Sequence, residues 1–125
     1  MKKVEYIYVA GLLTPRGIKS TNPAIEYLYN LRDIAKVQVD LIQAGLVPYP
    51  TGLDFLYFLI LPNGSRITEA TIKKISKKWL LRSDAILMTN GWSKSTGSID
   101  EKELAEKTGL PVFYSIKEIE EYNDK

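Results

Sequence analysis

Apolar segments of two different periodicities alternate along the chain, and this alternation constrains the fold more than any other feature of the sequence. Residues 4–10, VEYIYVA, are β-branched and aromatic and are followed by Gly11, which predicts a buried strand ending in a loop. Beyond Asn22 and Pro23, apolar residues recur at helical spacing until Gly45, which predicts a long helix. The positions expected on its buried side are Ile25, Leu28, Leu31, Ile34, Ala35, Val39, Leu41 and Ile42.

The same alternation continues to the C-terminus. Further strands are predicted over 46–49, 85–89 and 111–114, and further helices over 98–107 and 116–122. A helix also follows the turn Pro62-Asn63-Gly64, with a predicted buried side of Ile72, Ile75, Trp79 and Leu80. Strands that alternate with helices pair in parallel through right-handed crossovers. We therefore expect one α/β domain over residues 1–125, a small doubly wound sheet of four to five strands with helices on both faces, similar to flavodoxin or Rossmann folds.

The segment 53–61, LDFLYFLIL, is apolar on nearly all sides, so its periodicity does not separate a buried strand from a helix. We favour a helix. Its apolar surface has two possible uses, completion of the core or contact with a second copy of the chain, and we favour the core.

The sequence lacks both cysteine and histidine, which restricts the chemistry available to it. No thiolate nucleophile, imidazole base or Cys/His metal site is possible, so we expect no metal and no cofactor. Catalysis would depend on carboxylates, hydroxyls, amides and cations. No apolar stretch approaches the roughly 20 residues of a membrane span, and the N-terminus does not resemble a signal peptide. We expect a soluble cytoplasmic protein without a membrane partner.

Charge is unevenly distributed although the formal net charge is only +2. Residues 66–82 contain six basic side chains and one acidic one, whereas residues 100–125 contain eight acidic side chains and four lysines. The simplest interpretation is two solvated helix faces. The alternative is a nucleic-acid or partner surface on Lys73, Lys74, Lys77 and Lys78, which we consider less favoured because no aromatic residues interleave that face.

The loops after residues 10 and 89 are the predicted functional region, because ligands of doubly wound sheets bind outside the carboxyl ends of the strands. The second loop reads NGWSKSTGS over residues 90–98 and leads into a helix. Free backbone amides at a helix N-terminus, with nearby hydroxyls and Lys94, favour an anion such as phosphate. Neither a P-loop nor a dinucleotide-binding glycine pattern is present.

Glu101 is the carboxylate of most interest, because it is expected in the first turn of that helix, where the helix dipole would keep it ionised. An ionised carboxylate beside a sugar is a potential nucleophile. The competing interpretation is a capping box, in which Glu101 bonds back to the amide of Ser98.

Several short motifs together resemble the nucleoside 2-deoxyribosyltransferase-like superfamily, especially its short, phage-associated branch. They are YVAG at 8–11, SDAILM at 83–88 and GWSKSTGS at 91–98, followed by Glu101 and Ala105. The resemblance implies that Glu101 attacks C1′ of a deoxyribonucleoside and forms a glycosyl-enzyme, from which a second base or water takes the sugar. It also implies that Tyr8 lies against the substrate and orients Glu101.

Two positions depart from that superfamily. The transferases have an aspartate where this chain has Ser95, but a serine there is similar to the branch that hydrolyses deoxynucleoside 5′-monophosphates and contacts their phosphate. Ser95, Lys94 and Ser98 would then form a phosphate pocket, with Gly11 and Gly97 lining the substrate site. A supporting aspartate is replaced by Ser76, which leaves no evident donor for protonation of the leaving base.

Three further residues have both a functional and a structural interpretation. Trp92 either stacks on a nucleobase or packs its loop onto the sheet. Arg16 either reaches a phosphate or is a solvated loop cation. Asp84 either belongs to the site or serves the backbone of a neighbouring turn.

The resemblance therefore implies N-glycosidic bond cleavage or transfer on 2′-deoxyribonucleosides or their 5′-monophosphates. The alternative is a catalytically silent nucleotide-binding or sensing module that uses the same cleft. The family relationship also implies a homo-oligomer, with residues 53–61 as the candidate contact.

Overall fold

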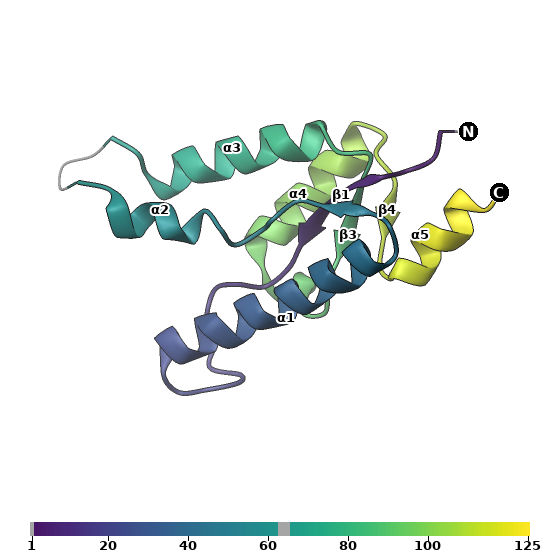
Figure 1. The fold of residues 1–125 in the computed structure, drawn as a ribbon. Helices are drawn as coiled ribbons and strands as arrows, with labels where there is room; N and C mark the ends of the chain where they lie inside the picture. The colour runs from purple at the N-terminus through teal and green to yellow at the C-terminus, as the bar shows by residue number, and fades with distance from the viewer. Residues whose placement is uncertain (1, 63–65) are drawn as a thin grey trace.

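The computed structural model describes residues 2–62 and 66–125, apart from the side chains of Phe55 and Phe58. The predicted turn at Asn63 and Gly64 lies outside the described residues. Four parallel strands form one sheet in the order β2-β1-β3-β4 (Figure 1). The strands are β1 (Tyr6–Ala10), β2 (Val47–Pro48), β3 (Ala85–Met88) and β4 (Val112–Phe113). This is the small doubly wound α/β sheet that the alternation of elements predicts.

Helices connect the strands as expected from the sequence. They are α1 (Pro23–Gln43), α2 (Phe55–Ile60), α3 (Glu69–Leu81), α4 (Thr96–Lys107) and α5 (Ile116–Asn123), with a short 3₁₀ helix at Trp92–Lys94. The helix predicted within residues 53–61 is confirmed as α2. None of the helices in the described parts of the chain combines the length and apolar character that a membrane span requires.

Two apolar cores lie on opposite faces of the sheet. On one face, Ile7 and Leu87 pack with Ile34 and Leu41 of α1 and with Ile119 of α5. On the other face, a second core joins the strands to α3 and α4 and contains Tyr8, Ala10, Leu80, Ile86, Met88 and Ala105. Strand β1 supplies both cores, because alternate side chains of a strand point to opposite faces.

The predicted buried side of α1 is only partly right. Ile25, Leu28, Val39 and Ile42 are exposed, whereas the polar Glu26 and Asn30 are buried together with Ile34 and Leu41. The first turns of α1 extend beyond the strands (Figure 1), so they meet the loop after β1 instead of the sheet. Polar backbone groups of that loop require polar partners, and Glu26 and Asn30 supply them.

The predicted buried side of α3 is also only half right. Ile72 and Leu80 are buried, but Ile75 and Trp79 are 43% and 54% exposed. Both side chains line a shallow apolar hollow beside β2, which is too short to cover them.

Helix α2 does not complete the core through its described side chains. Leu56, Tyr57, Leu59 and Ile60 are all about half exposed or more. Helix α2 and the start of α3 project together away from the sheet (Figure 1). The expectation that this segment is core is therefore wrong for these side chains.

Asp84 serves the backbone, as one of its two interpretations predicts. Its Oδ2 accepts hydrogen bonds of 2.9 Å from the backbone N–H groups of Glu5 and Tyr6, and its Oδ1 lies 3.4 Å from Lys2 Nζ. Asp84 thus fixes the start of β1 to the start of β3 and takes no part in the cleft described below.

Candidate functional site

A cleft opens at the carboxyl ends of β1 and β3, where the strand order of the sheet reverses direction. It has a volume of about 160 Å³. The loop after β1 and the start of α4 line it, together with Asp54 and residues of α3. A smaller hollow of about 90 Å³ adjoins it and shares Asp54, Lys73, Ser76, Gly97 and Glu101 with it. The predicted location, near the loops after residues 10 and 89, therefore coincides with this cleft.

A larger hollow of about 680 Å³ lies elsewhere, between β2 and α3. Its lining contains Ile75, Trp79 and Val47 with two basic residues at its margin, but no carboxylate. The smaller cleft contains three carboxylates, those of Asp54, Glu69 and Glu101, and lies at the edge of the sheet where ligands of such folds bind. The smaller cleft is therefore the candidate site.

Glu101 and Tyr8 form the centre of the cleft. The Tyr8 hydroxyl donates a short hydrogen bond to Oε2 of Glu101, which joins β1 to α4. The Tyr8 side chain is buried and its ring stacks on Tyr49 at a centroid distance of 5.0 Å. Tyr49 in turn packs against Trp79, so the Tyr8 phenol is held by ring stacking on one face and by the Glu101 hydrogen bond at its hydroxyl. The geometry places the Glu101 carboxylate in a fixed orientation toward the cleft.

Burial controls the protonation of Glu101 more strongly than the helix dipole does. Burial raises the pKa of Glu101 to about 7, against the lowering effects of the Tyr8 hydrogen bond and the Lys77 charge, and the charges of Asp54 and Asp100 raise it further. The expectation that Glu101 lies in the first turn, where the dipole would keep it ionised, is wrong. Helix α4 begins at Thr96, so Glu101 lies in its second turn, where the dipole effect has fallen off.

Tyr8 is correspondingly a poor proton donor. Burial, followed by the charge of Glu101, raises the pKa of Tyr8 far above its ordinary value. Its phenol therefore stays protonated and orients Glu101 by hydrogen bonding. This is the geometry expected for the two residues from the sequence resemblance.

The capping-box interpretation of Ser98 and Glu101 is wrong. The N-cap of α4 is Ser95, whose Oγ accepts a 3.1 Å hydrogen bond from the backbone N–H of Ser98. The buried Ser98 hydroxyl instead donates to the carbonyl oxygen of Gly11 at 3.0 Å. Ser98 therefore ties α4 to the loop after β1, and the Glu101 side chain remains available to the cleft.

The structure brings together some of the predicted substrate-binding residues and separates others. Gly11, Ser95, Gly97 and Ser98 line the cleft with Tyr8 and Glu101. Lys94 has an exposed side chain and is absent from the lining, as is Arg16 in the loop after β1. The phosphate pocket built on Lys94 therefore lacks its predicted cation, because the 3₁₀ helix turns that residue outward before α4 begins.

Trp92 packs its loop onto the protein, as its structural interpretation predicts. Its ring lies 6.0 Å from that of Tyr114, and Lys102 Nζ lies 5.6 Å from the Trp92 ring centroid. The side chain also packs against the core on the α4 side of the sheet. It does not line the cleft.

Several cleft residues were not predicted from the sequence as site residues. Lys73, in the predicted solvent face of α3, lines both hollows. Asp54 and Ser76 line both as well. Burial raises the pKa values of Tyr8 and Tyr49, and a hydrogen bond with Ser76 offsets a small part of that rise. The sequence signal for Ser76 was its position relative to Asp84, whereas Asp54 precedes an apolar segment and carries no comparable signal.

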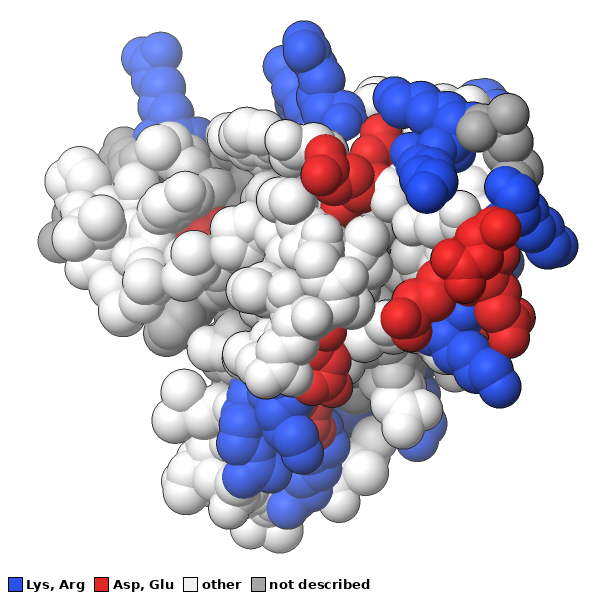
Figure 2. Space-filling model, turned by 45° about the vertical axis from the view of Figure 1, so that its right-hand side comes forward, with Lys and Arg blue, Asp and Glu red and all other residues white. Residues whose placement is uncertain are grey.

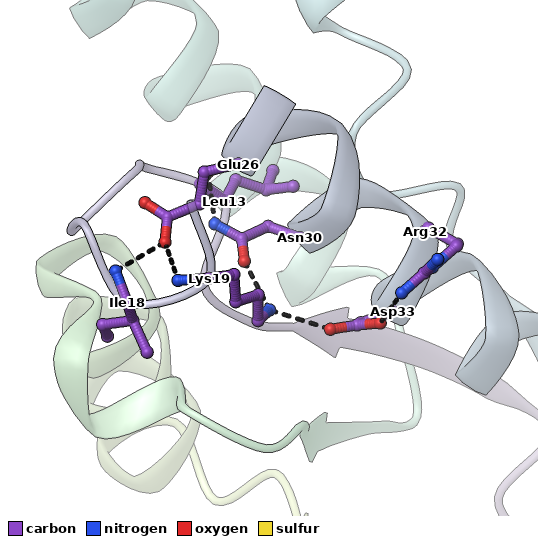
Figure 3. Close-up of polar contacts among 7 residues, drawn as sticks. All are labelled: Leu13, Ile18, Lys19, Glu26, Asn30, Arg32 and Asp33. Carbon is purple, nitrogen blue, oxygen red and sulfur yellow. Dashed lines mark hydrogen bonds and ion pairs between the residues drawn. The ribbon is translucent and has the colours of Figure 1, made fainter. Parts of the chain in front are cut away.

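A buried carboxylate outside the cleft holds the loop after β1. Glu26 accepts hydrogen bonds from four consecutive backbone N–H groups, those of residues 16–19, at 2.5 to 2.8 Å. Lys19 Nζ then bonds to Asn30 Oδ1 at 2.5 Å and to Asp33 Oδ2 at 2.8 Å (Figure 3). These backbone hydrogen bonds, that of Lys19 foremost, lower the pKa of Glu26 to about 2. The loop that supplies Gly11, Leu13 and Thr14 to the cleft is thereby fixed to α1.

The fold and the cleft define a small α/β protein of flavodoxin-like strand order, with a carboxylate–phenol pair at the point where the strand order reverses. Among the described residues, no group of three or more acidic side chains is placed to hold a metal ion. The chain belongs to the family described as Domain of unknown function (DUF4406), whose sequence profile matches residues 5–114. None of the curated proteins compared with it matches the chain in sequence.

Proposed function

We propose that this protein cleaves or transfers the N-glycosidic bond of a 2′-deoxyribonucleoside or its 5′-monophosphate, with Glu101 as the nucleophile. The observation that carries the proposal is the hydrogen bond from Tyr8 to Glu101 inside the cleft. The resemblance of the motifs around these residues to the nucleoside 2-deoxyribosyltransferase-like superfamily supports it independently of the geometry.

The proposed reaction has two steps. One oxygen of the ionised Glu101 carboxylate forms a bond to C1′ of the sugar while the bond from C1′ to the base nitrogen breaks, and the base leaves with a proton. Water or a second base then attacks C1′, and Glu101 is released as a carboxylate. A pKa of about 7 leaves a substantial fraction of Glu101 ionised at neutral pH. The Tyr8 hydroxyl stabilises that ionised form by donating its hydrogen bond.

A phosphate group has donors available at the start of α4. The backbone N–H groups of Thr96 and Gly97 lie in the first helical turn, where no intrahelical acceptor exists. Lys73 supplies a cation to the same cleft, in the place expected of Lys94. These groups favour a 5′-monophosphate over the free nucleoside.

A second subunit is part of the proposal. The cleft and its adjoining hollow are smaller than the roughly 300 Å³ at which sites for drug-sized ligands begin, so the base would extend beyond them. Helix α2, whose exposed apolar side chains include Leu59 and Ile60, begins directly after Asp54 at the edge of the cleft. We propose that α2 contacts a second copy of the chain, which would enclose the base. On the face drawn in Figure 2, a broad area on the left carries few charged side chains, whereas basic and acidic side chains lie next to one another on the right.

A catalytically silent nucleotide-binding module remains the second candidate. Ser76 in the cleft favours it, because a serine replaces the aspartate that supports catalysis in the similar superfamily. A silent module would bind nucleotide without releasing base. The Lys73, Lys74, Lys77 and Lys78 side chains are exposed, as a solvated face requires, and nucleic-acid binding by them stays a less favoured prediction.

The test is incubation of the purified protein with each deoxynucleoside and its 5′-monophosphate, with and without an acceptor base, followed by chromatography of the free base. We expect release by the wild type, none by Glu101→Gln, and unchanged release by Glu103→Gln, an exposed position on the same helix. Binding of nucleotide by the wild type without any release would overturn the enzyme and support the silent module.

A further inference from the structure

Asp54 occupies a position in the cleft that the two-step reaction leaves unexplained. It lines both the cleft and the adjoining hollow, as Glu101 does, and its side chain is only partly exposed. Its charge acts on Glu101, Tyr49 and Tyr27, so its carboxyl group lies near the phenols as well as near the nucleophile.

The carboxylate of Asp54 is not used to cap the helix that follows it. Asp54 is the N-cap residue of α2 but accepts no hydrogen bond there with its side chain. The N-cap side chains of the longer helices α1, α3, α4 and α5 all accept a backbone N–H. An aspartate at an N-cap ordinarily does the same. The Asp54 side chain thus faces the cleft without serving the helix.

The other acidic residues around the cleft are less suitable for contact with a leaving base. Glu69 lines the cleft but not the adjoining hollow, and its side chain is exposed at the start of α3. Asp100 lines only the smaller hollow and is likewise exposed. The Tyr8 hydroxyl already donates its hydrogen bond to Glu101, and its phenol stays protonated. Among the described acidic residues, Asp54 and Glu101 line both the cleft and the adjoining hollow. Because Glu101 is the nucleophile, Asp54 is the remaining candidate.

We infer that Asp54 is the general acid of the proposed reaction, and this inference rests on the proposed function. Asp54 takes a proton from solvent and passes it to a nitrogen or oxygen atom of the base while the C1′–N bond breaks and Glu101 bonds to C1′. The resulting Asp54 carboxylate then takes a proton from the water or the incoming base that attacks C1′. The proton that Asp54 takes from solvent in the first step is balanced by the proton that it returns to solvent after the second, and no further reactant is needed.

The test compares two substrates that differ in their need for an acid. The base of 2′-deoxyguanosine requires a proton to leave, whereas 7-methyl-2′-deoxyguanosine already carries a positive charge on its base and leaves without one. If the wild type prefers 5′-monophosphates, the 5′-monophosphates of these two nucleosides are used. If it prefers pyrimidines, the pair is 2′-deoxyuridine and 5-fluoro-2′-deoxyuridine, whose base leaves more readily. Variants Asp54→Asn and Asp54→Ala are compared with Asp40→Asn, an exposed aspartate on α1.

We expect Asp54→Asn to lower base release from the demanding substrate by about 10²- to 10⁴-fold and from the activated substrate by less than about tenfold. Added formate should restore part of the loss in Asp54→Ala, because a small carboxylic acid can occupy the vacated space. Asp40→Asn should match the wild type on both substrates, and thermal unfolding should show that all variants fold.

Two kinds of result contradict the inference and can be told apart. An equal loss on both substrates without formate rescue, or a substrate-dependent loss in Glu69→Gln instead, would show that Asp54 is not the acid while the proposed function stands. Absence of release from every substrate by the wild type would overturn the proposed function and the role of Asp54 together.

Discussion

The Tyr8 hydroxyl and the Glu101 carboxylate share a hydrogen bond although 93 positions of sequence separate them. Strand β1 carries the phenol and α4 carries the carboxylate, and Ser98 joins the same two segments through the carbonyl oxygen of Gly11. The contact is therefore a product of the fold, held on each side by buried groups. The predictions that follow test this contact and the structure around it.

Replacement of Tyr8 by phenylalanine should raise the pKa of Glu101 above about 7, because the Tyr8 hydrogen bond lowers it. A carbon-13 NMR titration of the Glu101 side chain measures this directly, whether or not the variant is active. Base release at neutral pH should fall by about 10- to 100-fold, the effect of losing one hydrogen bond to a charged group. Tyr6→Phe is the control, since Tyr6 is half exposed and does not line the cleft. Equal titration curves for Tyr8→Phe and the wild type would contradict the orienting role.

The pKa of Glu101 predicts how stability depends on pH. The folded protein binds this proton more tightly, at about pH 7, than the unfolded chain does near its ordinary value of 4.5. The stabilisation is complete below about pH 4.5 and is lost as the pH rises through about 7, a change of roughly 3 kcal/mol in the free energy of unfolding. Urea unfolding between pH 4.5 and 8 should show this decline in the wild type and a flatter profile in Glu101→Gln. Parallel profiles would count against the raised pKa.

Removal of the Glu26 carboxylate should release the loop after β1. Glu26→Gln replaces an oxygen that accepts backbone N–H groups by a donor, so it leaves N–H groups of residues 16–19 unpaired. We expect a lower melting temperature and faster proteolysis within residues 12–20, mapped by mass spectrometry. Because the pKa of Glu26 is lowered to about 2, its stabilisation is present above its ordinary pKa and disappears as the pH falls toward 2. The variant should therefore lose part of the acid sensitivity of the wild type, whereas the exposed Glu103→Gln should keep it.

Two glycines of the cleft should respond in opposite ways to alanine. A Cβ at Gly11 would lie 2.1 Å from Oγ1 of Thr89, whose hydroxyl already bonds to Ala10 O, and 3.2 Å from Ile34. Gly11→Ala should therefore cost about 1–3 kcal/mol in the free energy of unfolding. At Gly97 the nearest atom lies 3.9 Å away, and alanine is favoured within a helix. Gly97→Ala should keep its stability but narrow the cleft, so its base release should fall; unfolding curves and kinetics separate the two effects.

The proposed contact of α2 with a second copy is tested by the oligomeric state. We expect the wild type to sediment as a dimer or larger assembly and Leu59→Glu to shift it toward the monomer, because a charge on an apolar interface is poorly solvated. Leu28→Glu, which changes an exposed leucine on α1, should leave the assembly unchanged. A wild type that sediments only as a monomer at assay concentrations would contradict this contact.

The sequence alone determined the architecture, because the periodicity of apolar residues reports local structure. Alternating strand and helix patterns predicted the parallel sheet and its helices, and they pointed to the loops after β1 and β3, which border the cleft. The motif before Glu101 also directed attention to a carboxylate that lines the cleft. Periodicity predicts less well which side of a helix is buried by the rest of the protein. Ile25, Ile75 and Trp79 were expected to be buried and are exposed.

Only the tertiary structure decided which side chains meet in the cleft and what burial does to them. Asp54, Lys73 and Ser76 join Tyr8 and Glu101 through packing between segments far apart in sequence, and no local pattern encodes such a meeting. Lys94 and Trp92, although adjacent to the site in sequence, turn away from it. The pKa of Glu101 depended on its desolvation, which overrides the helix-dipole argument available from the sequence. Local propensity is a property of neighbouring residues, whereas solvation and proximity are properties of the folded chain.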